Sequence, residues 1–112
     1  MTHGDICLVD FGIPFGSDPG YKRPVVIVQS DKDNLSRLNT TVVVPLTSNI
    51  AKADLPGNVF ITKKESKLTK DSVALAHQII VVDKFRLGDP ISVMPQHIMK
   101  QIENAIDYVI KE

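Results

Sequence analysis

Residues 20–29, GYKRPVVIVQ, contain the apolar run around which we expect the fold to form. The unbroken run over 25–28 is typical of a strand that is buried on both faces. Pro24 fixes the backbone just before that run and removes one backbone donor, which suits the start of a strand. Arg23 therefore precedes a rigid strand. A guanidinium there suits either binding of a phosphate or carboxylate or solvation of a sheet edge, and this stretch by itself favours the second role.

Apolar runs of strand length recur along the chain and predict a mainly β fold. A helix is predicted over about residues 95–110, because Ile98, Ile102 and Ile106 recur at helical spacing. Many short strands and one closing helix favour a small barrel or a curled antiparallel sheet, with the helix packed on it or on a second subunit. We expect the strands over residues 5–11, 24–29, 40–46 and 58–62, with one or two more over 72–78 and 79–83.

The composition fits a single domain, over residues 1–112, with its own core. The formal net charge is zero, which excludes a strongly basic coat and leaves only a local site for any nucleic acid. Cys7, the only cysteine, permits no intrachain disulfide and fits a reducing cytoplasm. No apolar run approaches the roughly 18 residues that span a bilayer, and the N-terminus lacks the features of a signal peptide. We expect a cytoplasmic protein without a membrane partner.

No residue pattern predicts a metal or a bound cofactor. His3, His77 and His97 lie far apart in the sequence, and no two of them have the spacing of zinc ligands on a helix. Gly16 and Gly20 do not open a helix, as the glycines of phosphate-binding loops do. We therefore expect a protein that works with neither metal nor cofactor.

Four polar side chains stand at expected strand ends or within a strand pattern. Arg23 begins one strand while Thr47 and Ser48 end another, and antiparallel neighbours bring such ends together. A guanidinium and two hydroxyls suit a phosphodiester whose nucleophile comes from the substrate itself, as the 2′-hydroxyl of RNA does. Thr47 and Ser48 suit a capping pair at a strand end equally well. His77 has the pattern of a satisfied core histidine, but imidazole is a side chain that can move a proton in acid–base chemistry.

Four segments in a fixed order resemble the MazF/PemK toxins of bacterial toxin–antitoxin systems. They are GDICLVDF (4–11), YKRPVVIVQSD (21–31), TVVVPLTSNI (41–50) and LTKDSVALAHQIIVVDKFRLG (68–88). The resemblance covers nearly the whole chain, and the C-terminal helix is compatible with it. It implies a mainly β fold, a small SH3-like barrel (MazF/PemK/CcdB-like) with a C-terminal helix, that works as a homodimer.

The resemblance also implies an activity. Members of that family are metal-independent, sequence-specific endoribonucleases that cleave single-stranded RNA and leave a 2′,3′-cyclic phosphate and a 5′-hydroxyl. A cognate antitoxin blocks the active groove with its tail. Arg23 matches the family's arginine in the RPVV motif, and Thr47 matches the threonine of the (L/I)TS motif. Both are expected at the scissile phosphate, Arg23 as charge stabiliser and candidate acid, Thr47 as a donor to the phosphate.

His77 departs from the family pattern. An Asp stands directly before the Gln of this motif in the plasmid-borne branch, where it is assigned the base role, and many chromosomal members have Glu. Either His77 takes over proton transfer, or an acidic residue is not essential here; both alternatives stay open. The segment 12–21 resembles the family's mobile loop over the RNA groove, although a solvated loop position is favoured for Ser17 and Asp18. The substrate-contact candidates are Ser17, Asp18, Tyr21, Lys22, Ser48 and Gln78.

Two other functions stay open, because a fold does not fix a function. Toxins that poison DNA gyrase share this barrel, and so could a catalytically inactive regulatory protein. The presence of Arg23 together with Thr47 favours RNA cleavage over gyrase poisoning, and the inactive barrel stays open. The apolar stripe of the C-terminal helix is wider than a lid on one barrel requires, which favours a second copy of the chain as a partner.

Overall fold

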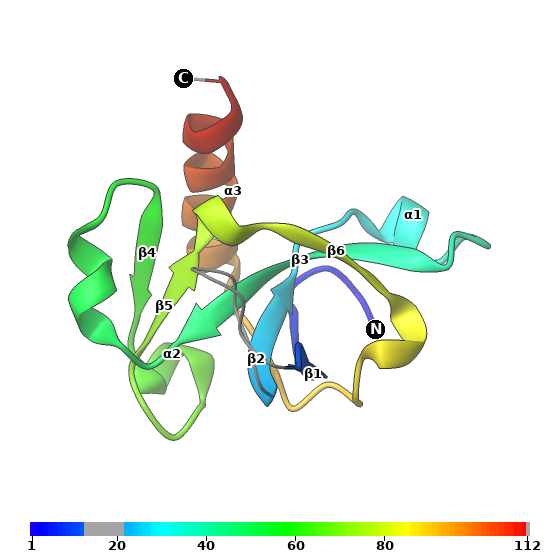
Figure 1. The fold of residues 1–112 in the computed structure, drawn as a ribbon, viewed down its shortest axis with the longest axis horizontal. Coiled ribbons are helices and arrows are strands. Elements are labelled where there is room, and N and C mark those ends of the chain that lie inside the picture. Colours follow the sequence, from blue (N-terminus) through cyan, green and yellow to red (C-terminus); the bar gives the residue numbers. More distant parts are fainter. Residues whose placement is uncertain (13–21, 112) are drawn as a thin grey trace.

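Seven strands in the described residues, 1–12 and 22–111 of this computed structural model, form a curled antiparallel sheet (Figure 1). They are β1 (Asp5–Asp10), β2 (Lys22–Ile27), β3 (Thr40–Thr47), β4 (Asn58–Ile61), β5 (Ser72–Leu75), β6 (Ile80–Asp83) and β7 (Ser92–Val93). Their order is β4-β5-β3-β2-β1-β7, and β6 pairs with β3 outside this path. The predicted mainly β architecture is confirmed, with the sheet curled into half a barrel.

The other strands are arranged around β3. Most of its residues are Val and Thr, whose branched side chains favour extended backbone. One edge of β3 pairs with β2, with Val25 opposite Pro45 and Ile27 opposite Val43. The other edge is shared, because β6 pairs with the first half of β3 and β5 with its last two residues. The end of β3 therefore lies between β2 and β5.

The chain makes a turn between β5 and β6 that interrupts the predicted strand pattern. The 3-10 turn η2 (Ala76–Gln78) separates the two strands, and the pairing with β3 shifts by the length of this turn. The apolar pattern predicts strands through 72–78 and 79–83, with His77 in extended backbone. That placement of His77 is wrong, because β5 ends at Leu75 and the chain bulges outward before β6 rejoins β3.

Short helices fill the connections, including one in the charged segment 63–71. The Thr62 hydroxyl accepts a hydrogen bond from the Glu65 backbone N–H at 3.1 Å, and a Glu65 carboxylate oxygen accepts from the Thr62 N–H at 3.0 Å. This reciprocal cap starts the helix, and Lys67, in the left-handed region at φ 61°, ends it. The short helices are α1 (Asp31–Asn34), η1 (Ile50–Asp54), α2 (Lys63–Ser66) and η3 (Lys84–Arg86).

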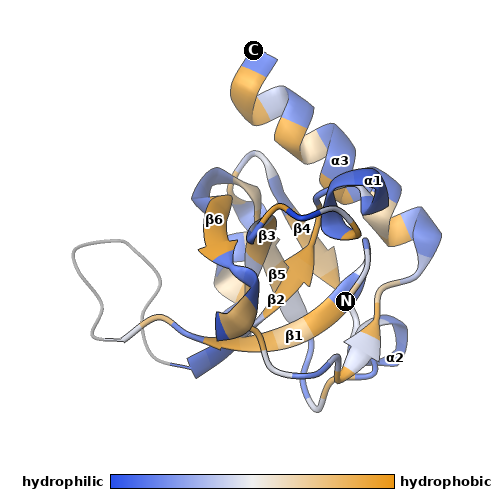
Figure 2. Cartoon of the chain, turned by 90° about the vertical axis from the view of Figure 1, so that its right-hand side faces the viewer, coloured by the Kyte–Doolittle hydropathy of each residue, from blue (hydrophilic) through white to orange (hydrophobic). Residues whose placement is uncertain are grey.

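The predicted C-terminal helix is α3 (Gln96–Lys111), which starts directly after Pro95, a residue suited to a helix start. It packs on β4 and η2, and its Ile102 is fully buried. Its C-terminal end projects beyond the sheet (Figure 2), and Tyr108 and Ile110 are 48% and 65% exposed. Across the part of the chain that the structure describes, every helix is too short or too polar to cross a bilayer.

Both faces of the central strands are buried, as their unbroken apolar runs predict. Successive side chains of a strand point to opposite faces. Ile6 and Val26 accordingly belong to the core beneath α3, while Cys7 and Val25 belong to a second core on the other face. Burial raises the pKa of the Cys7 thiol, so that it stays protonated and unreactive. The two cores hold the ends of β1, β2 and β3 in fixed positions.

Candidate active site

The strand register brings Arg23 and Thr47 to the same end of the sheet. Val25 of β2 lies opposite Pro45 of β3, so continuing this antiparallel register sets Arg23 level with Thr47. On the far side of β2, Arg23 pairs with Val9 of β1. The sequence prediction that a strand start and a strand end converge is therefore supported by the pairing of the strands.

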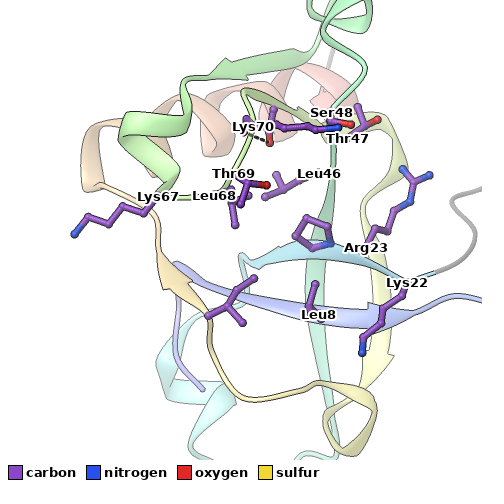
Figure 3. A pocket seen from close by; sticks show the side chains of 13 residues that line it. Leu8, Lys22, Arg23, Leu46, Thr47, Ser48, Lys67, Leu68, Thr69 and Lys70 are labelled. Carbon is purple, nitrogen blue, oxygen red and sulfur yellow. Dashed lines mark hydrogen bonds between the residues drawn. The ribbon is translucent and has the colours of Figure 1, made fainter.

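A pocket of about 630 Å³ opens at this end of the sheet (Figure 3). Its volume lies within the range of about 300–1,000 Å³ that is usual for ligand sites. The floor is aliphatic and the rim is polar. The lining residues are Leu8, Lys22, Arg23, Pro24, Leu46, Thr47, Ser48, Lys67, Leu68, Thr69, Lys70, Ser72 and Ile91.

The charge of this pocket is of one sign. Lys22, Arg23, Lys67 and Lys70 are the ionisable side chains among the described residues that line it, and the lining includes no carboxylate or imidazole. The chain as a whole is neutral, so this is the local concentration of positive charge that a nucleic-acid site requires here. Cations at the rim of a partly apolar pocket suit an anionic ligand with apolar parts.

Thr47 can both cap the strand end and bind a ligand. Its Oγ1 accepts a hydrogen bond from the Asn49 backbone N–H at 3.2 Å, which is the capping arrangement that the sequence suggests. The hydroxyl keeps its own proton, which it can donate to a phosphate oxygen. Asn49 in turn accepts from the Ala51 N–H at 3.3 Å and caps η1. The bond from Asn49 restrains the position of the Thr47 oxygen at the pocket.

Lys70 approaches Thr47 from the side opposite Arg23. Thr47 pairs with Val73 of β5, and the residues that lead into β5 therefore border the pocket. The side chain of Lys70 extends toward Ser48 and Thr47, whereas that of Lys67 points away from them (Figure 3). The sequence alone does not point to this segment, because its lysines are typical of a solvated loop.

His77 and Gln78 lie in η2 and are not among the residues that line the pocket. The exposed His77 ring is bonded through Nε2 to the Pro56 carbonyl at 2.8 Å. A carbonyl only accepts, so Nε2 carries a hydrogen. Gly57 follows at φ +81°, and a Cβ there would lie 2.8 Å from His77 Nε2. His77 is thus fitted against a turn in this chain.

The remaining predicted contacts divide into two groups. Lys22 and Ser48 line the pocket together with Arg23 and Thr47. Ser17, Asp18 and Tyr21 lie outside the described residues.

Within residues 1–12 and 22–111, the His, Cys, Asp and Glu side chains form no cluster of three or more that could hold a metal ion. Independence from metal remains a prediction for an activity assay.

Comparison with known sequences shows that the chain matches a protein family. The family model for the PemK-like, MazF-like toxin of type II toxin–antitoxin systems matches residues 2–110. Endoribonuclease MazF6 of Mycobacterium tuberculosis is 36% identical over 110 residues, which cover 98% of this chain and 96% of the relative. Endoribonuclease MazF of Staphylococcus saprophyticus is 42% identical over 107 residues, covering 96% and 88% of the two chains.

Solved structures share the fold. A mycobacterial endoribonuclease in complex with its cognate antitoxin superimposes with a TM-score of 0.81 at 21% identity, covering 99% of this chain and 95% of that one. MazF from Deinococcus radiodurans superimposes with a TM-score of 0.79 at 16% identity, covering 100% and 97%. At these identities the likeness establishes the curled sheet with its C-terminal helix.

Proposed function

We infer that this chain, which belongs to the PemK-like, MazF-like toxin family of type II toxin–antitoxin systems, is an endoribonuclease that cleaves single-stranded RNA. The observation that carries the assignment of its site is the pocket in which Arg23 and Thr47 meet. The sequence relatives are named for the same activity, which favours RNA cleavage over gyrase poisoning and over an inactive barrel.

In the proposed reaction the RNA supplies its own nucleophile. The 2′-hydroxyl loses its proton to solvent water as it attacks the adjacent phosphorus. The bond from phosphorus to the 5′-oxygen breaks and that oxygen takes up a proton, so that a 2′,3′-cyclic phosphate and a 5′-hydroxyl result. Arg23 neutralises the charge that develops on the phosphate oxygens and can protonate the leaving oxygen, while Thr47 donates a hydrogen bond that holds the phosphate in line. These roles need positioning and charge, which a cationic pocket offers without a metal.

Two alternatives are open for His77: it takes over proton transfer, or an acidic residue is not essential at this place in the motif. The position of His77 favours the second. Its ring is bonded to the Pro56 carbonyl, and it does not line the pocket that contains Arg23 and Thr47. A group that abstracts a proton must come within hydrogen-bond reach of it. We therefore assign His77 to the stability of the turn at Gly57, and Gln78 beside it to the same bulge.

We also propose a homodimer, inhibited by a cognate antitoxin, that works in the cytoplasm. β6 pairs with β3 on one edge only, and its Ile80 and Val81 are 38% and 59% exposed. Apolar side chains on an unpaired edge strand, together with Tyr108 and Ile110 of α3, offer a face for a second copy. A cationic pocket would attract an acidic segment of an antitoxin as readily as RNA.

The test is cleavage of a long single-stranded transcript, with the ends mapped and their chemistry determined. We expect cuts at defined sites with 2′,3′-cyclic phosphate and 5′-hydroxyl ends. Arg23→Ala should lower the rate by about 10² to 10³, the usual effect of losing one transition-state donor. Arg37→Ala, at an exposed site outside the pocket, is the matched control and should cut at the normal rate.

Two outcomes would contradict the proposal. An Arg23→Ala variant with normal turnover would remove this pocket from the reaction. An intact transcript, combined with inhibition of DNA supercoiling by the same preparation, would replace RNA cleavage with the gyrase alternative.

A further inference from the structure

We propose that Lys70 binds the backbone phosphate next to the one that is cut, so that the pocket holds a nucleoside between two phosphate contacts. The inference rests on the proposed RNA cleavage and adds a substrate contact to it. It assigns a role to a segment that the sequence indicates to be solvent-exposed loop.

The strand order places positive charge on both sides of Thr47. At its C-terminal end β3 has β2 on one side, bearing Arg23, and β5 on the other, preceded by Lys70. The amine of Lys70 extends toward Ser48 and Thr47, across the pocket from Arg23 (Figure 3). A phosphate held by Arg23 and Thr47 would therefore have a second cation on its far side, from which the next linkage of the strand is the one we propose that Lys70 binds.

Local bonds fix the backbone that carries Lys70. The Ser72 hydroxyl donates to the Lys70 carbonyl at 3.3 Å. The side chain of Asp71 accepts from the Lys63 backbone N–H at 2.7 Å, and the Leu68 N–H donates to the buried Ser66 hydroxyl at 3.1 Å. The segment is thus tied to α2 and to β5 at several points. Its lysine is presented to the pocket by an ordered backbone, which reduces the entropy cost of binding.

The Lys70 amine is also available. Among the described residues it makes no ion pair, whereas Lys84 is bonded to a backbone carbonyl at 2.7 Å and Lys111 to a carboxylate at 3.5 Å. An uncommitted ammonium near a concave apolar surface is suited to a phosphate, to which it brings a point charge.

The floor of the pocket matches what lies between two phosphates of RNA. Leu46 and Leu68 point into the space bordered by the cations (Figure 3), and Pro24 and Leu8 continue the aliphatic surface. In an RNA strand each nucleoside, with its apolar base faces, separates two charged linkages. The alternation of cation, aliphatic floor and cation in the pocket follows this repeat.

The first test compares Lys70→Gln with the wild-type protein on a short single-stranded oligoribonucleotide that spans a mapped cut site. We expect KM to rise about fivefold with kcat unchanged, since an exposed charge pair contributes little more than this. The slope of log affinity against log salt concentration should become shallower by about 0.7, the value for one phosphate contact to a single strand. Lys64→Gln, on α2 and outside the pocket, should change neither quantity.

The second test locates the phosphate. Oligomers carry one uncharged methylphosphonate at the linkage on either the 5′ or the 3′ side of the cut. One of the two should raise KM for the wild-type protein by the same factor as Lys70→Gln, and should cost the Lys70→Gln variant nothing further. Such non-additivity identifies a direct contact.

Three outcomes would overturn the assignment of Lys70 while leaving RNA cleavage intact. The variant could match the wild type in KM and salt dependence, it could lose kcat alone, or both uncharged linkages could cost the variant as much as they cost the wild type. Failure of the wild-type protein to cut any RNA would instead overturn the proposed function, so the two failures are distinguishable.

Discussion

The Pro56–Gly57 turn provides a quantitative test of where His77 belongs. Gly57 has a φ of +81°, and a Cβ placed there would lie 2.8 Å from His77 Nε2 and 3.1 Å from Val109 Cγ2. In Gly57→Ala the left-handed backbone alone costs about 1–2 kcal/mol. Displacing the ring from its 2.8 Å bond to the Pro56 carbonyl costs about 1 kcal/mol more. We therefore expect the free energy of unfolding to fall by about 2–3 kcal/mol.

Urea denaturation measures this loss, and Gly12→Ala is the matched control. Gly12 has a similar φ of +73°, but a Cβ there would meet no described residue within 4 Å, so its substitution should cost only the backbone part. In a His77→Ala background the extra cost of Gly57→Ala over Gly12→Ala should shrink to the cost of the 3.1 Å contact with Val109 Cγ2, because the ring that it displaces is gone. Equal losses for the two glycines in the wild-type background would refute this account of His77.

Three further predictions concern the pH dependence of stability, the role of His77 and metal. Hydrogen bonds from His97 and then from Thr62 lower the pKa of Glu65, so the stabilisation is present above its unfolded pKa near 4.5 and is lost as the pH falls through the lower folded value. Urea midpoints between pH 6 and pH 3 should show this loss in the wild-type protein, and a flat difference from Glu65→Gln would contradict it. His77→Ala should cleave RNA with the wild-type pH profile at temperatures where it is folded; loss of a limb near neutral pH would restore its catalytic role. Cleavage should continue undiminished in excess EDTA, and its abolition there with recovery on adding a divalent ion would show that a metal takes part.

The strands of the sheet are largely predictable from the sequence. The apolar runs of β1, β2 and β3 are unbroken, and residues such as Ile6 and Cys7, or Val25 and Val26, are indeed buried on opposite faces. The helical spacing of α3 is equally clear, and Ile102 lies at its centre in the core. In each case the pattern is local and reflects burial directly.

The turn η2 could not be found in the same way. Ala76, His77 and Gln78 stand in a stretch rich in Val and Ile with no Gly or Pro to mark a break. The bulge exists because β5 and β6 both pair with the same edge of β3 in different registers, which is a long-range property. The helix α2, by contrast, had a visible signal, since Thr62 and Glu65 have the spacing of a capping box.

The sequence predicts part of the candidate site. Arg23 and Thr47 stand at strand ends that the sequence can pair, and the resemblance to a toxin family points to both. The place of Lys70 at the site depends on the pairing of Thr47 with Val73, which brings a charged loop beside the end of β3. Charge alone indicates solvent exposure for such a loop. Only the register shows that its lysine faces a pocket.

The most direct test of the central claim is an oligoribonucleotide with one 2′-deoxy substitution on the 5′ side of a mapped cut. If Arg23 and Thr47 position a phosphate for attack by the RNA itself, removing that single hydroxyl should abolish cleavage there, while the same substitution one nucleotide away should leave it intact. Cleavage at the substituted position at the normal rate would contradict the account, because the nucleophile would then have to come from elsewhere.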